Sequence, residues 1–319
     1  GGSGAYSENI RFHRWYNKLN LALLVQTLVY YMLQKATWLH LRIPFSFYLL
    51  PVFVFACATV KPDGLLLTGL IFLILHLFLY PASNGFNSYF DKDEESIGGL
   101  EHPPKVSEEL YWTSLIFDGV ALVAGFMINW VFALMLFAYG LASKAYSHPL
   151  TRWKKKPLLG WLVAGFFQGY FTFMLVVVGL KDFSLELFLN ARYFAPAFLS
   201  SALLWGSYPM TQVYQHEEDG RRGDETLSRK LGVLGTFHFT AICFTAASGG
   251  FFYYFLTSYG MTTALAFLIA MGPVLAYFIW WYARVRKDRS QANFKNTMRL
   301  NLYSAICLNL FFSWLWLFT

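Results

Sequence analysis

Carboxylates gather in two short stretches of this 319-residue chain, which together hold twelve of its 18 Asp and Glu residues. The first stretch, residues 91–109, is preceded by the amide Asn87. Asn87, Asp91 and Glu95 are spaced i, i+4, i+8, so on a continuing helix they share one face. One amide and two carboxylates on a face offer the hard oxygen ligands that Mg²⁺ takes together with substrate phosphates. A solvated helix end is the alternative interpretation.

The second stretch covers residues 217–225 and lies far along the chain. Thr211, Gln215 and Asp219 repeat the same spacing, and two arginines, Arg222 among them, follow directly. Paired acidic sites with interleaved cations are typical of metal ions that bridge a diphosphate, with fixed positive charge neutralising the remainder. The pattern therefore favours a diphosphate substrate.

The elements that position these stretches are unusually apolar. Hydrophobic residues make up 56% of the chain and charged residues only 13%, whereas soluble domains carry about 25% charged residues. A soluble protein of this length could not bury so much apolar surface. We therefore predict an integral membrane protein, which excludes disorder, a coiled coil and a disulfide scaffold. Its net charge of +7 then reflects membrane topology rather than a nucleic-acid partner.

Nine runs approach the roughly 20 apolar residues that a membrane-crossing helix needs. They are 44–60, 63–83, 110–127, 129–146, 158–180, 193–214, 233–257, 261–283 and 299–318. The expected fold is all-α, a polytopic bundle of about nine transmembrane helices.

The N-terminal part of the chain is expected to stand apart from that bundle. A short apolar segment at 19–33, flanked by lysines, is interpreted as an interfacial helix, with a tenth span as the alternative. Residues 1–4, which are only Gly and Ser, are interpreted as a cloning scar. This leaves an N-terminal segment at 5–43 and a single transmembrane domain at 44–319.

Lys and Arg concentrate in the connections after the second, fourth, sixth and eighth runs. The remaining connections between runs hold only Lys61, Lys181 and Arg192. The positive-inside rule predicts that the lysine- and arginine-rich connections are cytoplasmic. Both acidic stretches lie in such connections, so both should meet on the cytoplasmic side, in the simplest case of a bacterial inner membrane.

At these residues the sequence resembles the UbiA superfamily of intramembrane prenyltransferases, which carries NxxxDxxxD after its second span and DxxxD after its sixth. The stretch from Tyr146 through Arg152 to Lys154 is similar to the family's Tyr-Ser…Arg-x-Lys element. The run that follows Asp219 is similar to the family's DRxxGxxTL. Two positions depart from the pattern, because Glu95 stands for the last Asp of the first motif and Gln215 for the first Asp of the second.

The resemblance implies a bundle around a central cavity that opens sideways into lipid. It also implies Mg²⁺-dependent transfer of a prenyl group from a polyprenyl diphosphate to an aromatic or other lipophilic acceptor. The implied catalytic residues are Asn87, Asp91 and Asp219. The implied metal ligands are Asn87, Asp91 and Glu95 for one ion, and Asp219 with Gln215 or Glu218 for the other. The implied diphosphate contacts are Tyr146, Arg152, Lys154 and Arg222.

Two other functions are compatible with parts of this pattern. A terpene cyclase of the same superfamily ionises the same substrate, and the acidic motifs do not separate it from a transferase. A transporter is disfavoured, because its polar residues are expected near the bilayer midplane rather than at one interface. Within the spans, Asp118 is either functional or paired with a neighbouring helix, and Arg42 either contacts substrate or extends to the membrane surface.

Overall fold

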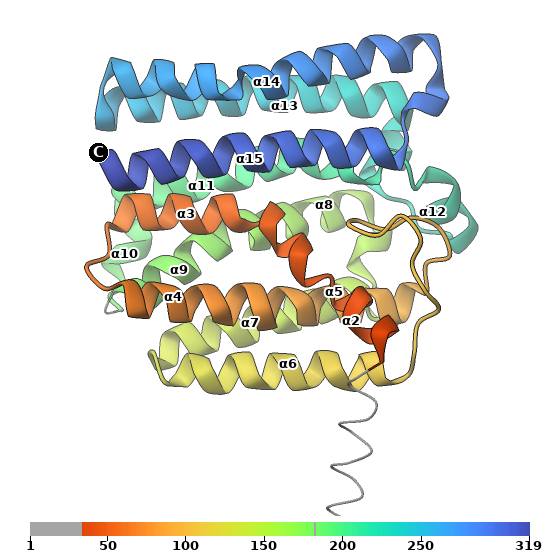
Figure 1. The fold of residues 1–319 in the computed structure, drawn as a ribbon, viewed down its shortest axis with the longest axis horizontal. Coiled ribbons are helices and arrows are strands. Elements are labelled where there is room, and N and C mark those ends of the chain that lie inside the picture. Colours follow the sequence, from red (N-terminus) through yellow and green to blue (C-terminus); the bar gives the residue numbers. More distant parts are fainter. Residues whose placement is uncertain (1–33, 182) are drawn as a thin grey trace, which may run out of the picture.

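The computed structural model describes residues 34–181 and 183–319, and within these ranges the chain folds into helices with no strand. Most of the long helices run parallel or antiparallel to one another (Figure 1). The predicted all-α fold is confirmed. The interfacial helix predicted at 19–33 lies outside the described residues.

The helices follow one another with short connections. The α-helices are α2 (Lys35–Leu41), α3 (Leu50–Val60), α4 (Leu65–Leu73), α5 (Tyr80–Asp91), α6 (Glu109–Phe126), α7 (Trp130–Ser147), α8 (Pro157–Phe166), α9 (Thr172–Leu180), α10 (Glu186–Leu189), α11 (Ala191–Ser207), α12 (His216–Arg222), α13 (Leu227–Tyr259), α14 (Met261–Lys287) and α15 (Phe294–Phe318). The other helical turns are the 3₁₀ helices η1 (Ile43–Tyr48), η3 (Trp153–Lys155), η5 (Tyr208–Gln212) and η6 (Arg289–Gln291), and the π-helices η2 (Ile74–Leu79) and η4 (Phe167–Phe171).

Six helices in the described ranges are long and apolar enough to cross a membrane. They are Leu65–Asp91, Glu109–Phe126, Pro157–Leu180, Leu227–Tyr259, Met261–Lys287 and Phe294–Phe318. The α2–η1 segment and α3 make a seventh if they are taken as one span bent by 44°. The predicted runs at 129–146 and 193–214 coincide with α7 and α11, which are not among the six, so the count of about nine spans is not confirmed. The apolar spans nevertheless support an integral membrane protein.

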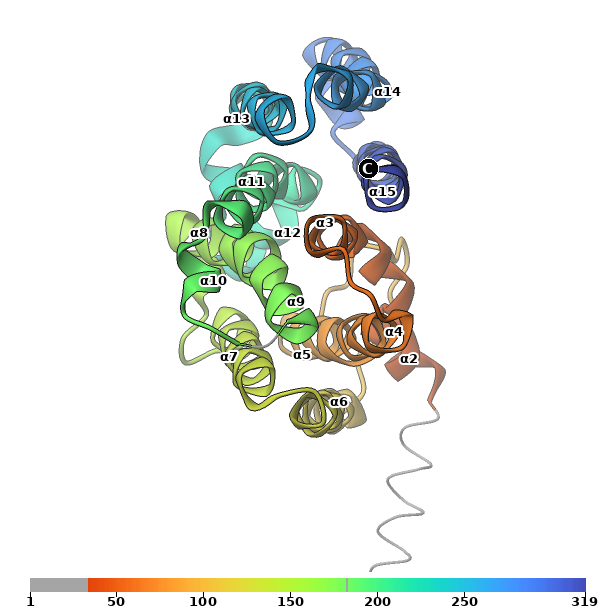
Figure 2. The ribbon, with the colours of Figure 1, turned by 90° about the vertical axis from the view of Figure 1, so that its left-hand side faces the viewer.

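The interior is filled by aromatic and aliphatic side chains. Figure 2, which looks along the helices, places α3 and α9 inside the bundle, with α6 and α14 at opposite ends of its cross-section. Accordingly, every residue of α3 except Leu50 and every residue of α9 except Leu180 is buried. Phe55 of α3 is fully buried, stacks on Phe312 of α15 at 4.3 Å and meets Phe173 of α9 edge-on at 5.5 Å. These contacts close the half of the bundle that lies away from α12.

A π-helical turn lets α11 approach the fifth predicted run closely. A Cβ at Gly169, in η4, would lie 2.5 Å from the backbone of Ser201 in α11, so only glycine fits there. The Ser201 hydroxyl accepts a hydrogen bond from the backbone N–H of Tyr170 and donates one to the carbonyl of Gly165. These bonds satisfy backbone groups at and just before the π-helical turn. Such turns are frequent at functional sites.

The acidic residue inside the third predicted run is paired. Asp118 of α6 forms an ion pair with Lys144 of α7, whose amine also lies over the ring of Phe86 at 5.0 Å. Of the two interpretations of Asp118, the structure therefore shows the pairing with a neighbouring helix.

The first acidic motif does not continue as a helix. The α5 helix ends at Asp91 because Lys92 adopts a left-handed conformation with φ of 49°, and its N–H closes the last turn on the Ser88 carbonyl. The chain then forms a long connection, residues 92–108, beside α12 at one end of the bundle (Figure 1). The prediction that Glu95 shares a helical face with Asn87 and Asp91 is therefore wrong.

Candidate active site

A cavity of about 240 Å³ lies at the end of the bundle that carries α12 and the connection 92–108. Its walls come from α5, α7, α8, η5 and α12, so residues far apart in the sequence meet there. Of the ten predicted site residues, seven line it: Asn87, Asp91, Tyr146, Lys154, Gln215, Asp219 and Arg222. The two acidic stretches thus meet at one site, as expected from their place in connections on the same side of the bundle.

One wall of the cavity carries the first motif. Asn87 faces the cavity from α5, and its amide nitrogen donates a hydrogen bond of 3.0 Å to the Ser147 hydroxyl of α7. That bond fixes the side chain, so its carbonyl oxygen can serve as a ligand. Asp91, one turn further on, is buried and is followed into the cavity by Asp93. This wall therefore presents one amide and two carboxylates.

The opposite wall carries the second motif. Gln215 is the residue before α12, and its amide nitrogen donates to the Ser96 carbonyl at 3.2 Å. Asp219 is buried and accepts a hydrogen bond of 3.4 Å from Thr226. Asp224 is only 1% exposed and lies beyond the left-handed turn at Gly223. This wall also presents one amide and two carboxylates.

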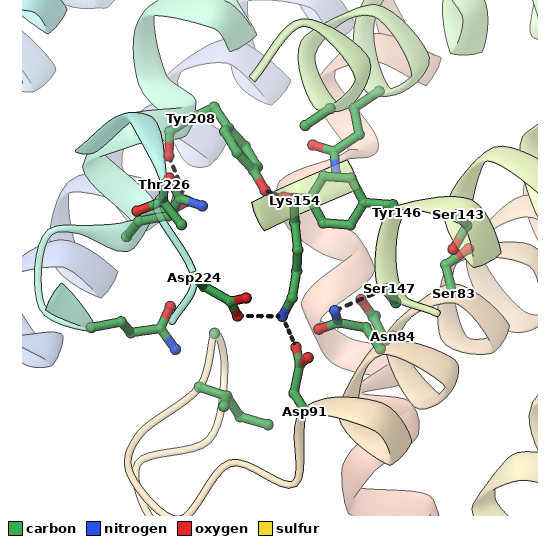
Figure 3. A pocket seen from close by; sticks show the side chains of 18 of the residues that line it. Ser83, Asn84, Asp91, Ser143, Tyr146, Ser147, Lys154, Tyr208, Asp224 and Thr226 are labelled. Atoms are coloured by element: carbon green, nitrogen blue, oxygen red, sulfur yellow. Dashed lines mark hydrogen bonds and ion pairs between the residues drawn. The ribbon is translucent and has the colours of Figure 1, made fainter. Parts of the chain in front are cut away.

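Lys154 lies between the two walls. Its amine pairs with Asp91 on one side and lies 3.7 Å from Asp224 on the other (Figure 3). Behind it, Arg152 donates two hydrogen bonds to Asp224, of 2.9 and 2.8 Å, and lies 3.5 Å from Asp91. Arg152 does not line the cavity, so it supports Asp224 from outside.

Two further cations face the cavity. Arg222 of α12 pairs with Asp93 and with Glu218. Arg42, which sequence reasoning left between two interpretations, lines the cavity and donates a hydrogen bond of 3.1 Å to the Gly98 carbonyl. Its place on the cavity wall favours a contact with substrate over one with the membrane surface.

The connection 92–108 is held over the cavity by α12. Glu218 accepts hydrogen bonds from the backbone N–H groups of Glu94 and Glu95, at 3.0 and 3.4 Å. The side chain of Glu95 turns outward and pairs with Arg221. Glu218 does not line the cavity. It therefore holds the connection in place, as a clamp, and is not positioned to bind a metal ion in the cavity.

The third predicted element contributes a tyrosine pair. Tyr146 of α7 and Tyr208 of η5 both line the cavity, and their hydroxyls are hydrogen-bonded to each other. Tyr208 was not singled out from the sequence. The pair therefore joins α7 to η5 across the cavity wall.

The sequence profile of the UbiA prenyltransferase family matches residues 47–304. This chain belongs to the UbiA prenyltransferase family. No curated protein sequence matches the chain.

Solved UbiA structures share the fold at low sequence identity. A UbiA homologue from Aeropyrum pernix K1 without ligand is 17% identical, with a TM-score of 0.64 over 84% of this chain and 96% of its own. A homologue from Archaeoglobus fulgidus bound to GPP and Mg²⁺ is 18% identical, with a TM-score of 0.61 over 88% and 98%. A digeranylgeranylglyceryl phosphate synthase is 19% identical, with a TM-score of 0.57 over 87% and 96%.

The two departures from the UbiA motifs have different outcomes in the structure. Gln215 keeps its place in the cavity, whereas Glu95 is 47% exposed at its side chain and lies outside. Asp93, with a side chain 7% exposed, takes the position that Glu95 was expected to fill. Sequence reasoning also missed Asp224. Both missed aspartates belong to the acidic stretches, but the assumed helical spacing excluded them.

The carboxylates differ in how readily they lose a proton. Burial raises the pKa of Asp93 to about 6, helped by the charge of Asp91 and opposed by Arg222. Burial raises the pKa of Asp219 to about 7, which Lys154 only partly opposes. Burial would also raise the pKa of Asp224, but its hydrogen bonds with Arg152 and the nearby Lys154 hold that pKa below its usual value. Of these three carboxylates, Asp219 is therefore the one whose burial is least offset by nearby positive charge.

The donor set fits Mg²⁺ bound together with a phosphate ligand. Within the described ranges, no three Asp, Glu, His or Cys side chains converge closely enough to hold a metal ion alone. Mg²⁺ in proteins typically takes only one or two carboxylates and completes its shell with substrate phosphates and water. One buried oxygen of Asp91 accepts no hydrogen bond and lies 3.5 Å from the Arg152 guanidinium, so its lone pairs stay available to an ion on the first wall.

Proposed function

We propose that this UbiA protein transfers a prenyl group from a prenyl diphosphate to a lipophilic acceptor within the membrane, with Mg²⁺ as its cofactor. The observation that carries the proposal is a single cavity in which paired carboxylates and fixed cations lie at the end of an apolar bundle. A substrate with a charged head and an apolar tail fits such a boundary.

The cations are assigned to the diphosphate. Lys154, Arg222 and Arg42 face the cavity from three different elements, so together they can surround a phosphate group. Fixed positive charge in a site shielded from water stabilises the charge that develops as the diphosphate leaves. Tyr146 is assigned a contact with the same group. Arg152 is assigned a supporting role, since it holds Asp224 and does not line the cavity.

The oxygen ligands are assigned to Mg²⁺. Asn87, Asp91 and Asp93 would hold an ion on one wall, and Gln215 with Asp219 on the other. When bound, Mg²⁺ neutralises charge on the leaving diphosphate. The connection 92–108, clamped by Glu218, keeps water from the carbon that is left electron-poor. Rings on the cavity wall near the carboxylates, such as Tyr208, can stabilise that carbon through their faces.

The orientation follows from the distribution of positive charge. The cavity lies on the side of the bundle that holds the lysine- and arginine-rich connections, so it is assigned to the cytoplasmic side. A bacterial inner membrane is the assigned location. Residues 44–319 are assigned to one catalytic domain.

The test is diphosphate release by purified protein in lipid nanodiscs. GPP is supplied with Mg²⁺ or with EDTA, and with or without 4-hydroxybenzoate as a probe acceptor, and the extracted lipid is analysed by mass spectrometry. We expect release that needs Mg²⁺, with a prenylated product. Asp91→Asn should abolish release, whereas Asp288→Asn, at an exposed residue outside the cavity, should leave it unchanged.

Other outcomes identify other functions. Release without an acceptor, with a cyclic hydrocarbon as product, would identify a terpene cyclase instead. No release with GPP, and none with shorter or longer prenyl diphosphates, would refute the proposal.

A further inference from the structure

The cavity is shallow. On α5 its deepest lining residue is Ser83, eight residues from Asp91, which corresponds to about 12 Å at the helical rise of 1.5 Å per residue. On α7 its deepest lining residue is Tyr139, eight residues from Ser147. No residue of α3, α4 or α9 lines it. The cavity therefore occupies only the part of the bundle nearest to α12.

Aromatic rings close the bottom of the cavity. Tyr139 is only 5% exposed, and its ring lies 6.0 Å from Phe167 and 6.1 Å from Tyr80. Phe167 also lines the cavity, whereas Tyr80 lies behind Tyr139 and is 2% exposed. Beyond them lies the tightly packed core around Phe55. We call Tyr139 and Phe167 the floor of the cavity.

The depth above the floor limits the length of an apolar tail. A diphosphate held by Lys154 and Arg222 occupies the upper part of the cavity, beside Asp91. An extended ten-carbon prenyl chain has eight carbons in line, which span about 9 Å with C–C bonds of about 1.5 Å. The 12 Å of helix between Asp91 and Ser83 thus has room for one or two five-carbon units and no more.

We propose that this site selects prenyl diphosphates with chains of five to ten carbons, and that Tyr139 sets the limit. The inference rests on the proposed function, because it takes the cavity to hold the diphosphate and the tail of one substrate. Tyr139 is a specificity-determining residue in this assignment. It touches the end of the tail and takes no part in binding the diphosphate.

The test measures binding of unreactive thiolodiphosphate analogues with five, ten and twenty carbons. Dissociation constants are determined by calorimetry in nanodiscs with Mg²⁺, so that no acceptor is needed. A group that finds no room in an apolar pocket costs about tenfold or more in affinity. We therefore expect the twenty-carbon analogue to bind at least about tenfold more weakly than the ten-carbon one.

Two variants move the floor in opposite directions. Tyr139→Ala should deepen the cavity and bring the twenty-carbon analogue to the affinity of the ten-carbon one. Ala142→Leu fills the cavity one turn above Tyr139 and should weaken the ten-carbon analogue about tenfold while sparing the five-carbon one. Tyr170→Ala removes a tyrosine that stacks on Phe166 and does not line the cavity, so it is the matched control.

Several results would overturn the inference. Equal affinity of the unaltered protein for the ten- and twenty-carbon analogues would mean that long tails leave the cavity sideways into lipid. If neither Tyr139→Ala nor Ala142→Leu changes the relative affinities for the five-, ten- and twenty-carbon analogues, the floor does not set the chain length. Ala142→Leu keeps the test decisive if Tyr139→Ala does not fold. Failure of every analogue to bind would refute the proposed function itself, and this inference with it.

Discussion

The contrast between Asp93 and Glu95 is the sharpest test of the site. The UbiA motif spacing selects Glu95 as the metal ligand, whereas the structure places Asp93 in the cavity and Glu95 outside it. The informative changes are Asp93→Asn and Glu95→Gln, since each removes one negative charge and keeps the shape of the side chain.

The expected magnitudes follow from burial. The side chain of Asp93 is 7% exposed and pairs with Arg222, which is 19% exposed. Removing one preorganised electrostatic group from such a site typically costs about 100-fold to 1,000-fold in rate, so Asp93→Asn should lower kcat/KM by about 100-fold or more. Glu95 and its partner Arg221 are 47% and 61% exposed. Such a pair contributes little, so Glu95→Gln should cost less than about threefold.

The assay is Mg²⁺-dependent diphosphate release from GPP, measured at several Mg²⁺ concentrations. Glu94→Gln, at an exposed neighbour, is the matched control. A large loss in Glu95→Gln with near-normal activity in Asp93→Asn would show that the motif spacing holds in the working enzyme. The left-handed end of α5 at Lys92 would then be incompatible with catalysis.

Three further predictions concern the protonation of Asp219, the ion pair between Arg152 and Asp224, and the close backbone contact at Gly169. Since the pKa of Asp219 is about 7, protons compete with the metal below that pH. The affinity for Mg²⁺, titrated with an unreactive diphosphate analogue, should therefore fall up to about tenfold per pH unit below 7, and a flat profile would contradict this. Asp224→Asn should lower the free energy of unfolding in denaturant by about 3 kcal/mol, because it removes the buried charge that accepts both hydrogen bonds of Arg152, and a loss below about 1 kcal/mol would argue against that pairing. Gly169→Ala should destabilise by about 2 kcal/mol or more because its Cβ meets backbone, whereas Gly119→Ala, with open space around it, should not, and equal melting temperatures would refute this.

The sequence alone predicted the helical fold and most of the residues that line the candidate site, because both leave a pattern in the order of residue types. Apolar runs mark helices, and the connections that hold acids and cations together mark the site. Asn87, Asp91 and Asp219 were found in this way, since each belongs to a motif with regular spacing.

What the sequence missed depends on local backbone geometry and on contacts across the chain. No glycine or proline marks the end of α5, so the left-handed Lys92 was not predictable, and with it the exchange of Glu95 for Asp93. Asp224 reaches the site after a turn at Gly223 and is held by Arg152, 72 residues away. The depth of the cavity depends on how aromatic rings pack, which spacing does not encode.

The position of Lys154 between the two walls has a consequence for the order in which ligands bind. Without substrate, Lys154 and Arg222 neutralise Asp91 and Asp93, so these carboxylates have little charge left to attract an ion. A diphosphate that takes over the two cations releases both carboxylates for Mg²⁺. Each ligand then raises the affinity for the other by the same factor, because coupling between two binding events is reciprocal. Metal alone and diphosphate alone should therefore both bind weakly, and the two together should bind cooperatively.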